Sequence, residues 1–445
     1  MAQFFKTARS KTPNHATIKL AVIEQLDHQG RGMLFHHNKP VFVEGALPDE
    51  LVDIAILETK KRYQKGRVLN THKASPLRIE AHCPHYQACG GCHLQHVESL
   101  TQINIKEQGL LTLFSRFAKY KPDTLAPALI SPSWHYRRCA RFGVMFNKKT
   151  KQVEMGFRQA GSKALVEQRV CPVLVPALEA LIVPVKKLLN TLHAKASLGH
   201  VEFVEAEQGV AILLRHLKSL SMEDQNTILQ FAKTHQVHFY VQPSPTQIVC
   251  LTDPSRLTYS LPEQACEFEF NIDDFVQVNA SVNEKMVAQA LQWLELKSTD
   301  RVLDLFCGLG NFSLPIARHV EQVVAVEGVQ KMVDRASHNA AQCDLDNVQF
   351  YQADLSDLTS LKADWAKQIY TKVLLDPARA GAAECLSFVA SKKPSHIVYV
   401  SCDPVTLARD SELLLNQGYL LHKLGAIDMF PQTAHIESMA LFIKK

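Results

Sequence analysis

The chain has 445 residues, of which 46% are hydrophobic and 21% are charged. At roughly 100–200 residues per domain, this length predicts two or three domains. The composition excludes a disordered or collagen-like chain, and no apolar run reaches the roughly 18 residues that span a bilayer. Because the first residues also lack the apolar core of a signal peptide, we expect a cytoplasmic monomer that makes no membrane contact.

Positive charge is concentrated near the N-terminus. Residues 1–75 hold 12 Lys or Arg against 7 Asp or Glu, whereas the rest of the chain holds 37 of each sign. A local excess of this kind attracts an anionic polymer such as a nucleic acid. A basic solubilising surface is the alternative that charge alone leaves open.

The first part of the chain predicts a small β-barrel. Residues 18–22 alternate between apolar and polar or small side chains, and further strands are expected at Val41–Val43, Val52–Leu57 and Arg67–Leu69. Short strands punctuated by glycine indicate a barrel of OB-like type. Basic residues lie at or beside its last turn: Lys60, Lys61, Arg62, Lys65 and Arg67.

The following segments have a mixed pattern. Residues 72–96 resemble a loop, and an imperfect apolar repeat predicts a helix over residues 97–120. Residues 128–268 alternate between strand and helix signals, with short apolar runs at Val210–Leu214 and Phe239–Val241. We therefore expect a middle domain that is mixed α/β or rich in β-strands.

From residue 271 the pattern is typical of a doubly wound α/β domain with a mostly parallel sheet. Short, apolar strands end at or just before a polar or glycine residue, and helical segments lie between them. These strands are expected at Val302–Phe306, Val323–Glu327, Val373–Asp376 and Ile397–Ser401. The predicted architecture is thus an OB-like barrel, a mixed α/β central domain and a C-terminal Rossmann-like domain.

Acidic or glycine-rich residues stand at the ends of these strands. Asp304–Asn311 contains two glycines, which let the backbone approach a ligand, but it lacks the third glycine of the dinucleotide fingerprint. Glu327 ends the next strand, where a carboxylate can accept hydrogen bonds from a ribose, and Asp354 and Asp376 end two more. Because such strand ends meet at one edge of the sheet, this order favours S-adenosylmethionine over NAD or ATP. A helix-capping aspartate with packing glycines is the alternative.

Cys402 lies just past the last predicted strand, in Ser401–Pro404. The Asp-Pro pair turns the chain there, so the thiol is expected at the same sheet edge as the cofactor. A thiolate is a good nucleophile when a helix N-terminus or a nearby charge lowers its pKa. A buried structural cysteine is the alternative for this residue considered alone.

Another group of cysteines consists of Cys83, Cys89 and Cys92, with Cys171 as a distant fourth. Four thiolates hold either an iron–sulfur cluster or a structural zinc ion. The unequal spacing does not match the paired CxxC segments of common zinc sites, and it favours an iron–sulfur cluster. Histidines in the same loop are expected to be ordinary loop residues.

An aromatic residue next to three cations suggests a surface for RNA. Tyr136, Arg137, Arg138 and Arg141 could together stack on a base and hold phosphates. A solvated strand face is the alternative.

The motifs of the C-terminal domain together resemble the RNA uridine-5 methyltransferase family. The segments that carry the resemblance are Asp304–Asn311, Asp376–Arg379, Ser401–Pro404 and His435–Ser438. With the barrel and the cysteine group, the chain is most similar to members that act on 23S ribosomal RNA and carry a TRAM domain and a [4Fe–4S] cluster. The domains this implies are a TRAM barrel at 12–71, a central iron–sulfur domain at 72–96 and 127–268, and a methyltransferase domain at 97–126 and 269–445.

The resemblance also implies residue roles. Cys402 would add to carbon 6 of uracil, and Glu437 would remove the proton from carbon 5 after methyl transfer. The target base would leave the stack of folded RNA, with Phe275 either stacking where it leaves or packing in the core. S-adenosylmethionine would be bound by Gln277, Phe306, Asn311, Glu327, Asp354 and Asp376. The [4Fe–4S] cluster would be held by Cys83, Cys89, Cys92 and Cys171.

Other functions compete with this reading. A transfer RNA uridine-5 methyltransferase would lack the barrel and the cysteine group, and another ribosomal type would lack the barrel. A non-catalytic RNA-binding assembly factor would not need Cys402 and Glu437. An iron–sulfur redox protein would need a second redox-cofactor motif, which the sequence does not show.

Overall fold

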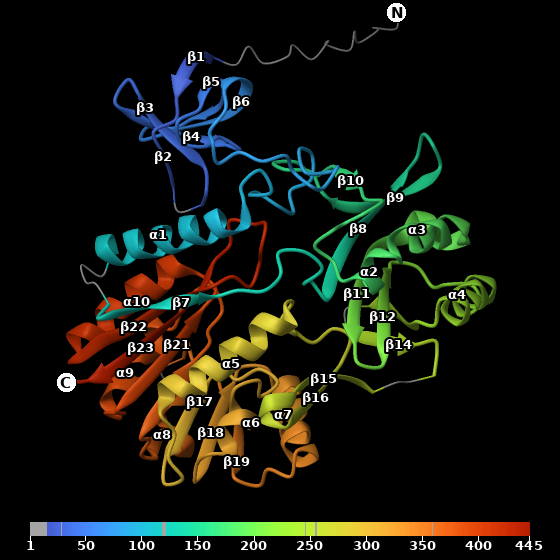
Figure 1. Ribbon diagram of the computed structural model, residues 1–445. Helices are drawn as coiled ribbons and strands as arrows, with labels where there is room; N and C mark the ends of the chain where they lie inside the picture. The colour runs from blue at the N-terminus through green and yellow to red at the C-terminus, as the bar shows by residue number, and fades with distance from the viewer. Residues whose placement is uncertain (1–15, 28, 118–121, 245, 254–255, 358) are drawn as a thin grey trace, which may run out of the picture.

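The computed structural model describes residues 16–27, 29–117, 122–244, 246–253, 256–357 and 359–445. The predicted start of the barrel at residue 12 and residues 118–120 of the predicted helix lie outside these ranges. Within the described part of the chain, no helix is long and apolar enough to cross a membrane. Figure 1 shows an N-terminal barrel above a C-terminal sheet, with the middle of the chain beside both.

The N-terminal barrel is built from six strands. These are β1 (Thr17–Val22), β2 (Gln25–Leu26), β3 (Gly32–His36), β4 (Lys39–Glu44), β5 (Leu51–Thr59) and β6 (Gln64–Lys73). Their order is β1-β5-β6-β4-β3-β2, so the two edge strands are successive segments of the chain. The register shifts between Ile18 and Ala21, where Leu20 has a φ of +51°. Leu20 and Val22 are therefore 60% and 54% exposed, while Ala21 and Ile23 are buried.

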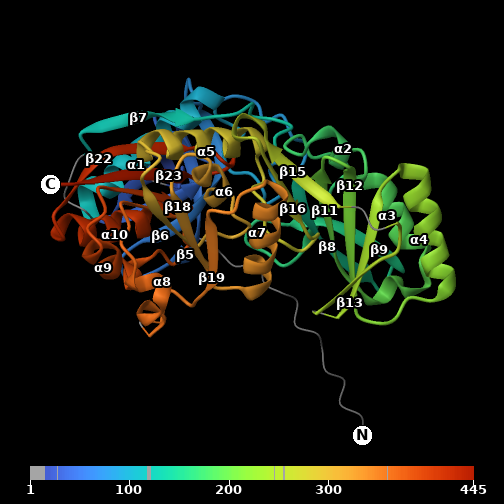
Figure 2. The same cartoon turned by 90° about the horizontal axis from the view of Figure 1, so that it is seen from below.

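The middle of the chain forms a seven-stranded sheet. Its strands are β8 (Cys139–Asn147), β9 (Gln152–Arg158), β10 (Leu165–Glu167), β11 (Leu198–Ala206), β12 (Gly209–His216), β13 (His238–Ser244) and β14 (Gln247–Cys250). The order is β10-β9-β8-β11-β12-β13-β14, and only the β12–β13 pair is parallel among these. Its helical segments are α2 (Pro176–Glu179), α3 (Ile182–Thr191), η1 (His193–Ser197) and α4 (Met222–His235). Helices α3 and α4 pack on the sheet (Figure 2).

The C-terminal sheet has eight strands and a mostly parallel core. Its strands are β7 (Thr124–Leu129), β17 (Arg301–Leu305), β18 (Gln322–Glu327), β19 (Val348–Gln352), β20 (Lys372–Leu375), β21 (His396–Ser401), β22 (Tyr419–Ile427) and β23 (Glu437–Lys444). The order is β19-β18-β17-β20-β21-β23-β22-β7. Strands β17 to β21 are parallel, whereas β23 is antiparallel to both of its neighbours. The predicted doubly wound α/β fold is confirmed.

Helices cover both faces of this sheet, and apolar clusters fill the space beneath them. They are α1 (Ser99–Phe117), α5 (Ala280–Leu294), α6 (Ser313–Ala317), α7 (Gln330–Gln342), η3 (Ser360–Lys362), α8 (Asp364–Lys367), α9 (Ala383–Ser391) and α10 (Pro404–Asn416). A hairpin of β15 (Leu257–Leu261) and β16 (Cys266–Phe270), with η2 (Pro262–Gln264) in its turn, packs against α7.

Helix α1 lies against α10 and β22 (Figure 1), although both elements are distant from α1 in the sequence. Its buried face is not purely apolar, because Gln102 and Lys106 are buried whereas Leu100 is exposed. The Lys106 ammonium group forms an ion pair with Asp428, at 2.6 Å. Polar groups on α1 therefore face the C-terminal domain.

Candidate active site

The predicted catalytic residues follow neighbouring strands of the C-terminal sheet. Asp376 follows β20, Cys402 follows β21, and Glu437 is the first residue of β23. Strand β21 pairs with both β20 and β23, and Ser401 lies opposite Ser438. Because β23 is antiparallel, it begins at the edge where the parallel strands end. The fold therefore brings Cys402 and Glu437 together on adjacent strands.

Burial and mutual repulsion raise the pKa values of these groups. Desolvation, followed by the charge of Asp376, raises the pKa of Glu437 to about 8, and desolvation raises the pKa of Asp376 to about 7. The pKa of Cys402 rises to about 11 through desolvation and the charges of both carboxylates, although Arg379 lowers it. In the free protein, burial and two carboxylates thus outweigh the one cation near the Cys402 thiol.

The turn after Cys402 is held by local hydrogen bonds. Asp403 caps α10, and its Oδ1 accepts hydrogen bonds from the backbone N–H groups of Val405, at 2.9 Å, and Thr406, at 3.4 Å. Ser401 Oγ donates to the backbone oxygen of Asp403, at 3.0 Å. Proline at the first helical position has a suitable φ. The thiol is thus held on a rigid strand-to-helix turn.

The turn after β17 has an unusual backbone. Phe306, Gly308 and Gly310 all have positive φ, at +65°, +55° and +90°. The φ of Gly310 favours glycine, and a Cβ there would also lie 2.5 Å from Leu314 Cδ1. Glu327 Oε2 accepts a hydrogen bond from the backbone N–H of Gly308, at 3.2 Å. The predicted ribose-binding carboxylate therefore lies directly against the glycine turn.

Another carboxylate, Asp304, lies beneath this turn. Asp304 is fully buried and accepts a hydrogen bond from Ser313, but its Oδ1 has no hydrogen-bond partner among the described residues. Desolvation, and then the charges of Asp376 and Glu327, raise the pKa of Asp304 to about 7. This edge of the sheet therefore brings together carboxyl groups whose charges raise one another's pKa.

Two of the predicted cofactor residues make contacts that the sequence did not indicate. Asn311 exchanges side-chain hydrogen bonds with Asn283, at 2.9 and 3.0 Å, and its Oδ1 also accepts one from Tyr259, at 3.1 Å. The backbone oxygen of Gln277 accepts a hydrogen bond from Arg138, at 2.8 Å. Asn283 and Tyr259 lie on α5 and β15, outside the motifs, so no spacing in the sequence pointed to them.

Asp354 and Phe275 are both exposed. Asp354 binds the backbone N–H and hydroxyl of Ser356, which lower its pKa. Phe275 is 69% exposed. The core-packing alternative for Phe275 is wrong, because its ring lies in solvent.

The predicted RNA-binding group is only partly on the surface. Tyr136 is buried, and its hydroxyl donates to the backbone oxygen of Pro431, at 3.0 Å. Arg138 is also buried, with its guanidinium 4.7 Å from the ring centre of Tyr259. Both residues line a cavity of about 750 Å³. Both residues pack between domains, so the alternative of a solvated strand face is wrong for them, and their contact with RNA stays a prediction.

The predicted cluster cysteines lie within electrostatic reach of one another. Desolvation, followed by the charges of Cys92, Cys83 and Cys89, raises the pKa of Cys171 to about 12. The backbone N–H of Gly91 donates to Cys89 Sγ, at 3.4 Å. However, no group of three or more His, Cys, Asp or Glu side chains in the described ranges is arranged to hold a metal ion. The predicted metal site is therefore not confirmed.

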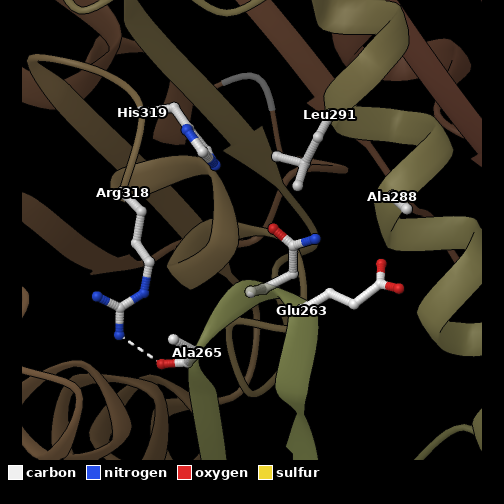
Figure 3. Close-up of a pocket in the computed structure, with 7 residues that line it drawn as sticks. Glu263, Ala265, Ala288, Leu291, Arg318 and His319 are labelled. Carbon is white, nitrogen blue, oxygen red and sulfur yellow. Dashed lines mark hydrogen bonds between the residues drawn. The ribbon is translucent and has the colours of Figure 1, made fainter.

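A separate cavity of about 420 Å³ lies away from this site (Figure 3). It is lined by Glu263 in the β15–β16 turn, Leu291 on α5, and Arg318 and His319 after α6, and Arg318 donates to the backbone oxygen of Ala265. None of the predicted site residues lines it.

Comparisons with known proteins agree with this geometry. Residues 98–445 match the family model described as tRNA (Uracil-5-)-methyltransferase, and residues 17–69 match the TRAM domain. The 23S rRNA (uracil(1939)-C(5))-methyltransferase RlmD of Psychromonas ingrahamii is 57% identical over 442 residues, which cover 99% of this chain and 100% of that protein. The protein of the same name from Shewanella sediminis is 46% identical over 444 residues, covering 99% of each chain.

A solved structure has the same fold over most of the chain. The Pyrococcus abyssi tRNA (uracil-54, C5)-methyltransferase, in complex with S-adenosyl-L-homocysteine, superposes with a TM-score of 0.72 at 20% identity. The match covers 95% of this chain and 100% of that one. The family model and the full-length relatives show that this chain belongs to the RNA uracil-5 methyltransferase family and carries an N-terminal TRAM domain.

Proposed function

We propose that this protein transfers a methyl group from S-adenosylmethionine to carbon 5 of a uridine in 23S ribosomal RNA. The observation that carries the proposal is that Cys402 directly follows β21 and Glu437 begins the adjacent strand β23, at the same edge of the sheet. The full-length relatives named for uracil 1939 support the choice of RNA and of position. A substrate in 23S RNA agrees with the expected cytoplasmic location.

Cys402 and Glu437 are proposed to act in different steps of the reaction. Carbon 5 of uracil is a weak nucleophile until the thiolate of Cys402 adds to carbon 6, which places negative charge on carbon 5 and the carbonyl oxygen. When bound, S-adenosylmethionine supplies an electrophilic methyl group on a sulfonium. Glu437 then takes the proton from carbon 5, and the electrons of the carbon 6–sulfur bond return to Cys402. The uridine leaves methylated and the thiolate is regenerated.

The acidic edge of the sheet supports the choice of cofactor. Asp304, Glu327 and Asp376 lie at successive strand ends, and the pKa of Asp304 is raised partly by the other two. A cofactor with a sulfonium and an ammonium group would relieve this repulsion. Glu327 would hold the ribose, and the other predicted residues would surround the rest of the cofactor.

The target base has to reach Cys402 from inside folded RNA. Turning a nucleotide out of the stack costs a few kcal/mol, which contacts with the extruded base must offset. Phe275 is exposed, so its ring is free to stack on a base. We propose that Phe275 supports the uridine as it leaves the RNA.

The four cysteines are proposed to hold a [4Fe–4S] cluster. Support comes from the chemistry of the group: thiols from two segments that raise one another's pKa, and a backbone N–H that donates to Cys89 Sγ. Thiolates held close together need a cationic partner, and iron–sulfur clusters are bound by such sets. The cluster would tie the loop of residues 83–92 to Cys171.

Two single variants test the chemistry. Cys402→Ala should bind S-adenosylmethionine and RNA but transfer no methyl group. Glu437→Gln should add the thiol and transfer the methyl group, then stall, because the proton on carbon 5 cannot leave. A covalent protein–RNA adduct that survives denaturing electrophoresis should therefore accumulate, and mass spectrometry should place the nucleotide on Cys402.

Controls separate the RNA classes and the thiols. Methylation of 23S ribosomal RNA fragments should exceed methylation of transfer RNA, and the reverse preference would redirect the proposal to transfer RNA. Cys307→Ala is the matched thiol control, because Cys307 lies after β17 in the same domain. Full turnover by Cys402→Ala, or an adduct on Cys307, would overturn the assignment.

A further inference from the structure

The loop between β22 and β23 leads into Glu437 and contains an unfavourable backbone conformation. This segment, residues 428–436, is called the base loop here. Gln432, near its middle, is 2% exposed and has a φ of +67°, a conformation that residues with a Cβ rarely adopt. Contacts from outside the loop must therefore hold it in this shape.

The side chain of Gln102, on α1, makes such contacts. Its Oε1 accepts a hydrogen bond from the backbone N–H of Gln432, at 3.1 Å, and its Nε2 donates to the side-chain oxygen of Gln432, at 2.9 Å. The same Nε2 lies 3.0 Å and 2.8 Å from the backbone oxygens of Leu94 and Val97. Because Gln102 is also 2% exposed, removing its side-chain amide would leave buried polar groups of Gln432 without these partners.

Neighbouring segments complete this support. The backbone N–H groups of His93 and Leu94 both donate to the backbone oxygen of Gln432, at 2.9 and 3.0 Å. On the other side, Lys106 donates to Asp428, at 2.6 Å, where the loop begins. Gln102 lies between these anchors, and it alone of the residues named here binds both the backbone and the side chain of Gln432.

We infer that Gln102 is a positioning residue for Glu437. It touches no reacting atom, and it acts by holding Gln432, and with it the base loop, in the shape that places Glu437 beside Cys402. The inference rests on the proposed function, because it assigns Gln102 to the proton-removal step of that reaction. Addition of the thiol and transfer of the methyl group depend on β21 and the cofactor edge, so loss of Gln102 should affect mainly the last step.

The test is Gln102→Met, which keeps the length of the side chain and removes its hydrogen bonds. Turnover should fall about 10- to 100-fold, since a misplacement near 1 Å has effects of that order. Affinity for S-adenosylmethionine, and adduct formation with RNA that carries 5-fluorouridine, should stay within about twofold of wild type, because neither requires proton removal. With ordinary RNA, the covalent adduct should accumulate during turnover.

The matched control is Gln108→Met, at an exposed position of the same helix, which should behave as wild type. Wild-type turnover by Gln102→Met, or equal losses in adduct formation and turnover, would overturn the inference alone. If Gln102→Met no longer binds cofactor, Gln102→Glu serves as a second variant. It keeps the acceptor for the Gln432 N–H but loses the Nε2 donor to the Gln432 side chain, so the covalent adduct should still accumulate. Absence of that accumulation would also overturn the inference. A wild-type protein that forms no adduct would instead overturn the proposed function.

Discussion

The carboxyl group of Glu437 has to lose its own proton before it can accept one from uracil. Its pKa is raised to about 8 by burial and by Asp376, so most of it is protonated at neutral pH. Because the deprotonated form is the active base, resolution of the covalent adduct should become faster as pH rises. Below the pKa the rate should increase about tenfold per pH unit, and it should level off above pH 8.

Rapid-quench measurement of adduct decay between pH 6 and 9 checks this expectation. Adduct formation with 5-fluorouridine RNA is the control, because it needs the Cys402 thiolate but no base at carbon 5. Its profile should keep rising beyond pH 8, since the thiol pKa is about 11. A decay rate that does not change over this range would contradict the role of Glu437.

Substitution of the single residue Cys171 tests the proposed iron–sulfur cluster. It is buried, and three other thiols raise its pKa together with burial. Cys171→Ser should lower bound iron and the visible absorption of the purified protein, because one thiolate ligand is lost. Cys250→Ser, which changes a cysteine outside the group, should leave both unchanged. One zinc ion per chain and no visible absorption in the wild type would rule out the cluster.

Among the helices, α1 forms a buried ion pair with the C-terminal domain. Lys106 and Asp428 are 4% and 6% exposed, and burial lowers the pKa of Lys106. Lys106→Met leaves Asp428 buried without its partner, which should cost about 3–5 kcal/mol of unfolding free energy. The double variant Lys106→Met/Asp428→Leu should be more stable than the single one, because no unpaired charge remains.

Urea unfolding of the single and double variants measures this difference. Lys233→Met, on the last turn of α4, is a control for the loss of a lysine at a helix surface. A single variant as stable as wild type would mean that the pair contributes nothing to the attachment of α1.

At the scale of the whole molecule, the barrel is expected to bring positive charge to the RNA. Lys61 and Arg62 are exposed at the turn between β5 and β6, and the variant Lys61→Ala/Arg62→Ala removes two positive charges that are expected to contact phosphates. For single-stranded RNA the slope of log affinity against log salt should become shallower by about 1.4. Cofactor affinity should not change, because its proposed residues lie beyond residue 270.

Filter binding at several salt concentrations measures these slopes. The matched control is Lys148→Ala/Lys149→Ala, at the exposed turn between β8 and β9. Equal slopes for wild type and Lys61→Ala/Arg62→Ala would show that this turn does not contact phosphate.

The sequence predicted the parallel strands closely. The strands expected from Val302 to Ser401 begin and end within one residue of the observed ones, because buried parallel strands are short apolar runs that end at polar or glycine residues. The same reasoning placed Cys402 at the edge of the sheet. These features depend on local sequence, which a single chain shows directly.

Local pattern was a weaker guide where a strand bends or a helix buries polar groups. Alternation alone would place Leu20 on the inner face, but the bulge beside it turns the side chain to solvent. On α1, the apolar repeat predicted the helix but not its buried polar residues, and the buried face includes Lys106 because Asp428 lies opposite. In both cases the deciding partner is distant in sequence.

The sequence by itself determined which functional groups follow the successive strands: a glycine turn, a series of carboxylates, a cysteine and a glutamate, each within a local motif. Only the tertiary structure decided that the Cys402 pKa is raised, that Tyr136 and Arg138 are buried, and that Gln102 holds Gln432. The reason is physical. Motifs depend on residues that are near in the chain, whereas desolvation, charge repulsion and hydrogen bonds between loops depend on which groups the fold places side by side.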